Sequence, residues 1–260
     1  MNTLALKLTV TPVLILLASL ASRRWGESIG GWFVGLPLTS GPVCFFLALD
    51  EGPEFAAMAG LGCLAGAAAE AGFCIAYGRV ARHAGWPVAL SVASVAFVAG
   101  AAVLSAVALP LWPLAFLVCA ALTLALWLLP WLRRGDARLP GLPGLPGLPP
   151  WDIPARMIVA TSLVLGLTAL APFAGPRLSG LLATYPVFAA VLAVFGQHGG
   201  GAAAAIQVLR GLLTGLFAFT GFFAALTLGL PSLGIAAGFA LATMVALAIQ
   251  AASLRLLRRA

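Results

Sequence analysis

The fold is decided by residues 84–132, which read AGWPVALSVASVAFVAGAAVLSAVALPLWPLAFLVCAALTLALWLLPWL. This stretch contains no Asp, Glu, Lys, Arg or His. A transmembrane helix needs about 20 apolar residues to cross ~30 Å of hydrocarbon, so the stretch is long enough for two spans, separated near Pro110 and Pro113. Its apolar residues run continuously rather than alternating with polar ones, which favours helices over a transmembrane barrel.

The rest of the chain has the same character. Of its 260 residues, 62% are hydrophobic and only 8% are charged, and the mean hydropathy is +1.10. A soluble domain carries roughly 25% charged residues because its surface must face water. In lipid, backbone polar groups must instead be satisfied within helices or a closed barrel. We therefore expect an all-α integral membrane protein whose surroundings are the lipid bilayer.

The charge-free runs predict about nine transmembrane helices. We expect the pair within 211–254 to divide at Gly229 and Pro231. The nine expected spans are residues 3–21, 31–49, 54–78, 86–108, 111–131, 156–174, 178–196, 202–226 and 230–254.

Basic residues are distributed unevenly over the expected connections. With nine spans, the connections near 22–30, 79–85, 132–155 and 197–201 share a side with the C-terminus. The opposite side carries Lys7, Arg177 and the acidic cluster Asp50, Glu51 and Glu54. This cluster is expected to be a solvated turn that caps the next span, with attraction of cations at an outer mouth as the alternative. Basic residues concentrate in cytoplasmic loops. We expect a bacterial inner-membrane protein with its N-terminus outside and its C-terminus in the cytoplasm, and the net charge of +7 does not call for nucleic acid. The basic residues on the cytoplasmic side are Arg23, Arg24, Arg79, Arg82, Arg133, Arg134, Arg138, Arg156, Arg255, Arg258 and Arg259.

Several kinds of chemistry find no support in the sequence. No nucleophile triad, phosphate-binding loop, zinc-ligand spacing or dinucleotide fingerprint occurs, so we expect no enzyme, no cofactor and no metal. The four cysteines lie inside apolar stretches without His or carboxylate residues at ligand spacing, and buried thiols are the expected role. These cysteines are Cys44, Cys63, Cys74 and Cys119.

The chain repeats itself at an ungapped offset of 149 residues. Seven of the twelve glycines in 26–85 fall on another glycine, and Pro37 falls on Pro186. The offset covers five expected helices, an odd number, so the second copy crosses the membrane in the opposite direction. The matched glycine pairs are Gly26/Gly175, Gly31/Gly180, Gly52/Gly201, Gly62/Gly211, Gly66/Gly215, Gly72/Gly221 and Gly85/Gly234.

This repeat predicts a 4+1+4 arrangement of the helices. Residues 1–108 form the first four-helix repeat and residues 156–260 form the second, inverted one. Residues 109–155 contain a linking helix and a cytoplasmic Leu-Pro-Gly linker, LPGLPGLPGLPP at 139–150, which is expected to be a stiff spacer. Two oppositely oriented repeats are a recurring transporter device because they can exchange conformations.

The second copy resembles the GlpM family of small four-helix bacterial membrane proteins. The likeness is carried by Gly180-Leu181-Leu182, Tyr185-Pro186, Phe188-Ala189 and Val208-Leu209-Arg210, and more loosely by 35–42 in the first copy, GLPLTSGP. It would cover residues 3–105 and 156–254. The resemblance implies a four-helix unit and a link to exopolysaccharide production. Two fused units joined by an added helix depart from that family's pattern.

The second helix of each copy is interrupted at the matching place. Proline removes a backbone donor and clashes with the preceding turn, and irregular backbone at membrane depth survives only in protein or beside a polar cavity. Paired interruptions therefore point to a substrate site, with a pair of packing kinks as the alternative. The expected substrate-binding residues are Pro37, Thr39, Ser40, Thr184, Tyr185, Pro186, Gln207 and Arg210.

Two charged side chains fall inside the expected spans. Glu70 and Arg210 both lie roughly 13–15 Å from the cytoplasmic ends of their helices, so they could form a charge pair that lowers the cost of burying either one. The pair would either couple transport to an ion or act as a structural bridge. Gly62 and Gly66, like Gly211 and Gly215, have a small-xxx-small spacing, and we expect 54–78 and 202–226 to pack together.

These observations predict a secondary transporter. The substrate would be a small molecule, with an anion as one option because Arg210 could anchor it, and alternating access would run between the two repeats. The alternative is a non-transporting scaffold subunit of an envelope or exopolysaccharide assembly. A homodimer is left open as a further partner.

Overall fold

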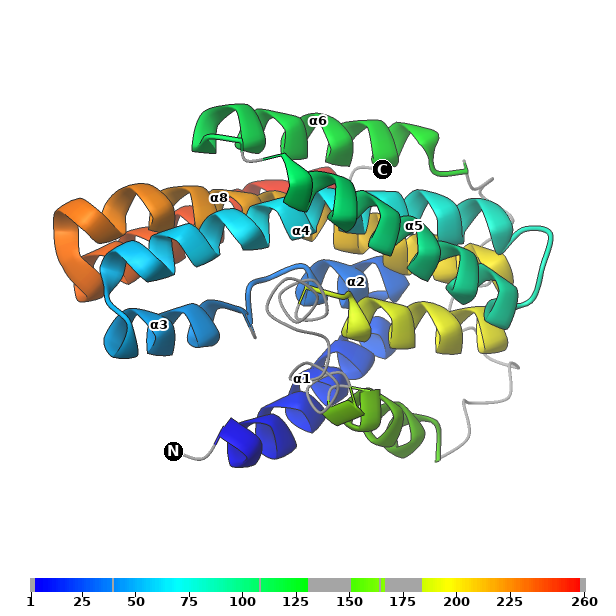
Figure 1. The fold of residues 1–260 in the computed structure, drawn as a ribbon. Coiled ribbons are helices and arrows are strands. Elements are labelled where there is room, and N and C mark those ends of the chain that lie inside the picture. Colours follow the sequence, from blue (N-terminus) through cyan, green and yellow to red (C-terminus); the bar gives the residue numbers. More distant parts are fainter. Residues whose placement is uncertain are drawn as a thin grey trace.

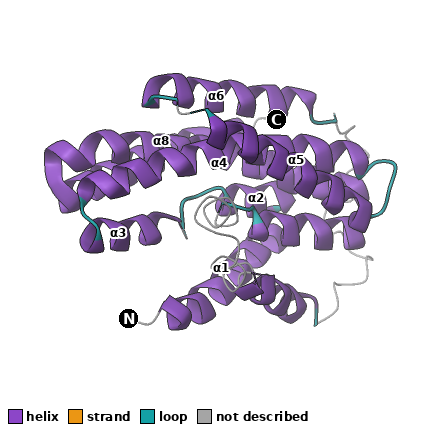
Figure 2. Ribbon diagram, in the orientation of Figure 1, coloured by secondary structure: helices purple, strands orange, loops and turns teal. Residues whose placement is uncertain are grey.

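The computed structural model describes residues 3–38, 40–107, 109–130, 151–163, 165–166 and 184–257. These residues form helices and connecting turns, with no strand among them (Figure 2). Four of the helices are long and apolar enough to cross a membrane. The expected class, an all-α membrane protein, is confirmed for this part of the chain.

Six labelled helices make up the first part of the chain. Pro53 and Pro87 lie in the first turns of α4 and α5, where the missing proline N–H costs no helical hydrogen bond. The expected span 31–49 is two helices, because α2 ends at Val34 and α3 begins at Ser40. The helices are α1 (Thr3–Trp25), α2 (Glu27–Val34), α3 (Ser40–Asp50), α4 (Pro53–Val80), α5 (Trp86–Ala106) and α6 (Leu111–Leu128).

The second part contains a helical stretch at 152–163 and the long element α8 (Val187–Leu257). α8 bends at Gly201 (φ 74°, ψ −172°) and at Gly234 (φ 75°, ψ −179°), and it therefore consists of three straight segments. The second bend was expected at Gly229 and Pro231, and that expectation is wrong. The turn needs a backbone conformation that is essentially restricted to glycine, and Gly234 supplies it.

α4 and the middle segment of α8 lie side by side and antiparallel, and the other helices are arranged around them (Figure 1). Thr227 on α8 donates to the Ala57 carbonyl on α4 over 3.3 Å, which confirms the expected packing of these two helices. α2 packs on α8, α5 packs on α4, and α6 contacts both central helices. α1 contacts α2 on the opposite side from α6 (Figure 1).

The outer surfaces of these helices are apolar. Val95 is 68% exposed on α5, and Phe116 and Trp127 are 78% and 74% exposed on α6. In water such surfaces would be costly, whereas hydrocarbon solvates them. Trp25, at the end of α1, and Trp112, at the start of α6, are also exposed, as an interfacial aromatic belt requires.

Candidate functional site

The two interruptions expected from the sequence have the same local geometry. At the first, the Leu38 N–H donates to the Leu36 carbonyl over 2.8 Å, which closes a three-residue turn around Pro37. At the second, the Val187 N–H donates to the Tyr185 carbonyl over 2.8 Å, and Pro186 lies at the centre of that turn.

The helix that follows each turn also begins in the same way. The Pro37 carbonyl accepts a hydrogen bond from Gly41 over 2.9 Å, and the Pro186 carbonyl accepts one from Ala190 over 2.8 Å. Each matched atom lies 149 residues from its counterpart, which is the offset of the sequence repeat. The two breaks are thus one turn motif used twice.

Each break also lies against the long helix of the other half of the chain. A Cβ added to Gly35 would lie 2.7 Å from the Cα of Gly215 on α8, so the two backbones are in direct contact. A Cβ added to Gly66 on α4 would lie 2.7 Å from the Cβ of Thr184. The offset converts Gly35 into Thr184 and Gly66 into Gly215, so one contact is the exchanged counterpart of the other.

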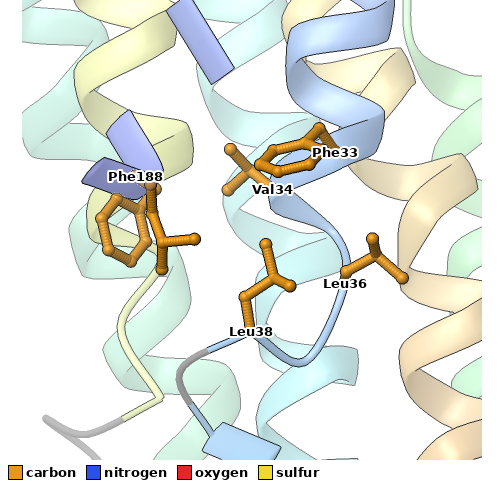
Figure 3. A pocket seen from close by; sticks show the side chains of 6 residues that line it. Phe33, Val34, Leu36, Leu38 and Phe188 are labelled. Atoms are coloured by element: carbon orange, nitrogen blue, oxygen red, sulfur yellow. The ribbon is translucent and has the colours of Figure 1, made fainter. Parts of the chain in front are cut away.

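A small hollow separates the two breaks (Figure 3). Leu36 and Leu38 border it from the first break, and Phe188, just beyond the second, lies across from them. Its volume is about 20 Å³, which is the space of roughly one water molecule. The remaining lining side chains, Leu14, Phe33 and Val34, are apolar too. The described residues therefore leave room for no solute larger than about one water molecule in this hollow.

Tyr185 faces α4 and α5. Its hydroxyl lies 2.8 Å from the Ser94 Oγ, and its ring meets Phe73 and Phe97 edge-on with centroids 6.0 and 5.5 Å away. The second break is therefore anchored to two helices of the first half. The other expected site residues are less closely joined: Gln207 is half-buried on α8, Ser40 starts α3, and Thr39 lies outside the described residues.

The structure does not bring Glu70 and Arg210 together as an ion pair within 4 Å. Glu70 is buried on α4, one turn after Gly66. The Arg210 guanidinium donates to the carbonyls of Leu129 and Pro130, over 3.2 Å each, at the end of α6. A cation is favourable there because the last carbonyls of a helix lack helical partners. Arg210 thereby ties the linking helix α6 to α8.

A buried group of charges that the sequence analysis did not single out joins the two halves. Asp152, at the start of the helical stretch 152–163, accepts from Arg23 of α1 over 2.9 Å. Its carboxylate also lies 3.1 Å from the Nε of Arg156, one turn further on. Arg156 is 2% exposed, and its guanidinium lies 5.1 Å from the centre of the Phe195 ring on α8. We call Arg23, Glu27, Asp152 and Arg156 the charge cluster.

Glu27 completes the charge cluster from the first turn of α2. The side chain lies in the connection 22–30, outside the expected spans, and the residue is 8% exposed. Burial raises the pKa of Glu27, while the charge of Arg156 opposes that rise. The sequence contains two pairs of opposite charge at i, i+4 spacing, Arg23/Glu27 and Asp152/Arg156, which could have predicted this cluster. The two arginines were instead interpreted as basic residues of cytoplasmic loops.

The described residues contain no group of three His, Cys, Asp or Glu side chains placed to hold a metal ion. No protein-family model, no curated protein and no solved structure matches this chain. The site is therefore interpreted from its own geometry.

Proposed function

We propose that this chain is a secondary transporter of a small substrate, in which two inverted four-helix repeats alternate access to a site between the breaks at Pro37 and Pro186. One observation carries the proposal. The same proline-centred turn occurs twice at the repeat offset, and each copy lies directly against a glycine of the opposite half, Gly215 for the first break and Gly66 for the second. Discontinuous helices at a repeat interface are where transporters of this design bind their substrates.

The proposal includes the nine-span, 4+1+4 topology in a bacterial inner membrane, with residues 1–108 and 156–260 as the two repeats. Gly52 and Gly201 support the repeat, because both are helix joints with positive φ (95° and 74°) and lie 149 residues apart. A relationship to GlpM-like four-helix proteins is part of the same proposal.

The geometry supports a closed state of such a transporter. The hollow holds about one water and is lined by apolar side chains, so a solute enters only after one half moves relative to the other. Turn carbonyls freed by Pro37 and Pro186 then become the polar groups available at membrane depth. This chemistry fits a small solute held mainly by backbone groups, and an anion would require Arg210 to leave its contact with α6.

The test is charge movement by the purified full-length protein in liposomes on a solid-supported membrane. Small anions, organic acids, amino acids and lipid precursors are applied in turn, and labelled-substrate counterflow covers electroneutral exchange. We expect a substrate-dependent signal that falls at least about tenfold in Gly66→Ala, because the new methyl group forces Thr184 and the second break to shift. Glu70→Gln tests the acidic side chain one turn away and is expected to abolish flux.

Gly72→Ala is the matched control. Gly72 lies on the same helix, but a Cβ there would meet only the Ala96 carbonyl oxygen, at an ordinary 3.9 Å. It should transport as the wild type does. If all substrates give neither current nor counterflow with well-folded protein, the transporter proposal fails, and a partner that copurifies stably would favour the scaffold alternative.

A further inference from the structure

The two carboxylates of the charge cluster differ in their partners, because Asp152 forms ion pairs within 4 Å and, among the described residues, Glu27 does not. Asp152 is bridged by two arginines and Arg156 lies over Phe195, so these groups have close partners. Glu27 is 8% exposed, and its Oε2 atom is buried without a hydrogen-bond partner. A buried ionised carboxylate with an unsatisfied oxygen is costly, whereas a protonated one is neutral and can donate.

The charged groups around Glu27 limit which ion its carboxyl can bind. From α1 it is faced by Arg23, and from the helical stretch 152–163 by Asp152 and Arg156. From α8, which packs on α2, no described titratable group acts on Glu27, since Arg210 is directed to the end of α6. Two guanidinium groups beside the carboxyl repel an added cation, and Asp152 already occupies them as an anion would. Burial opposes this repulsion in the case of a proton, because a proton bonds covalently to the carboxylate and removes its buried charge.

The position of Glu27 links it to the proposed transport site. It lies in the first turn of α2, directly after Gly26, whose φ of 99° sets the start of this helix. The other end of α2 is the break at Gly35. Between them, Gly31 is in direct backbone contact with Val208 of α8. α2 is a short helix that packs closely on α8, so a movement at Glu27 would also displace its other end, at the break.

We propose that Glu27 is a proton-binding site, and that gain or loss of its proton shifts α2 and so opens or closes the break at Pro37. The inference rests on the proposed function, because it makes the proton the coupling ion of that transporter. With the proton bound, the cluster carries one net positive charge and the Glu27 carboxyl is neutral. Without the proton the cluster is neutral overall, but a buried carboxylate oxygen lacks a partner, which loosens α2.

The experiment uses full-length protein in lipid and two measurements that do not require a substrate. Infrared difference spectra between about pH 5 and about pH 9 follow the protonated-carboxyl band. Hydrogen exchange read by mass spectrometry follows the backbone of 27–38 in wild type and Glu27→Gln at the same pH. We expect a titrating component of this band that is present in wild type and absent from Glu27→Gln. We also expect exchange at least about twofold faster in wild type than in the variant at high pH, and equal at low pH.

Glu54→Gln is the matched control, because Glu54 is an exposed carboxylate at the start of α4 and should leave both measurements unchanged. Glu27→Asp keeps a titratable group if Glu27→Gln inserts poorly, and it should retain a band with an altered midpoint. A titrating band that is identical in wild type and Glu27→Gln, or exchange that is equal at both pH values, overturns the inference; a band component from buried Glu70 is common to both proteins and cancels in the comparison. If substrate flux is observed but neither the infrared band nor the hydrogen exchange responds to Glu27→Gln, the inference about Glu27 is wrong and the proposed transport stands. If both respond but no substrate gives flux, the proposed transport is wrong and the proton site stands.

Discussion

Asp152 joins α1 to the helical stretch 152–163 through its contacts with two arginines. It is 5% exposed and lies between the guanidinium groups of Arg23 and Arg156. Two charge-assisted contacts offset the cost of burying its carboxylate. The same contacts hold α1 to the helical stretch 152–163, although more than a hundred residues separate them in the sequence.

Replacing this carboxylate should destabilise the protein strongly. Asp152→Asn leaves Arg156 buried with only Glu27 as a nearby anion, and breaking a buried pair from one side costs on the order of 3–5 kcal/mol. We expect a clearly lower midpoint in thermal unfolding of the detergent-solubilised protein. Glu51→Gln removes an exposed carboxylate and should leave the midpoint unchanged. Equal midpoints for wild type and Asp152→Asn would show that the cluster contributes nothing to stability.

Sequence reasoning about single residues was least successful for Glu70 and Arg210. Spacing predicted similar depths for them along their helix axes, but depth does not specify the direction in which a side chain leaves its helix. With 3.6 residues per turn, neighbouring positions point in different directions. Arg210 is directed to the end of α6, a contact that no spacing within α8 could predict.

At the scale of elements, close glycine contacts decide which helices touch. Gly211 on α8 is in direct backbone contact with Ser28 of α2, and Gly215 lies against Trp32 and Gly35. The sequence analysis identified Gly211 and Gly215 as a close-packing surface but assigned it to the helix that contains Gly62 and Gly66. Small-xxx-small spacing marks a surface for close approach without naming the partner.

The close contact between α2 and α8 can be tested by adding a methyl group at Gly211. In Gly211→Ala the new Cβ collides with the Ser28 carbonyl, so α2 must move away. Overpacking of this kind costs about 1–3 kcal/mol, which should appear as a lower thermal midpoint. Gly196→Ala is the control on the same element, because its Cβ would meet its nearest atoms at 3.7 Å. If Gly211→Ala is as stable as Gly196→Ala, the close contact between α2 and α8 is incorrect.

For the whole molecule, the charges at the two ends of α4 favour one orientation. Glu51 and Glu54 are exposed near its start, and Arg79 and Arg82 are exposed near its end. Arginines are retained in the cytoplasm when a helix inserts, so the end of α4 is expected on the cytoplasmic side. The proposed nine spans, an odd number, would then place the two termini on opposite sides of the membrane.

Reporter fusions test this arrangement. A fluorescent protein that matures only in the cytoplasm should be bright at the C-terminus and dark when it follows Glu51. Alkaline phosphatase, which is active only outside, should give the reverse pattern. The physical reason is the excess of arginine on the side of the C-terminus. Fusions that report the same side at both positions would contradict the nine-span topology.

The sequence by itself determined the membrane class, the approximate ends of α4, α5 and α6, and the helix breaks at Pro37 and Pro186. These features depend on short-range causes, because long apolar runs require lipid and proline lacks a backbone donor. The position of the second bend of α8, at Gly234, came from the structure. The tertiary structure alone decided that Gly211 meets Ser28, that Arg210 ends on α6, and that Asp152 joins Arg23 to Arg156. Such contacts depend on how each helix is rotated about its axis and on which distant segment packs against it, and neither follows from spacing along one chain.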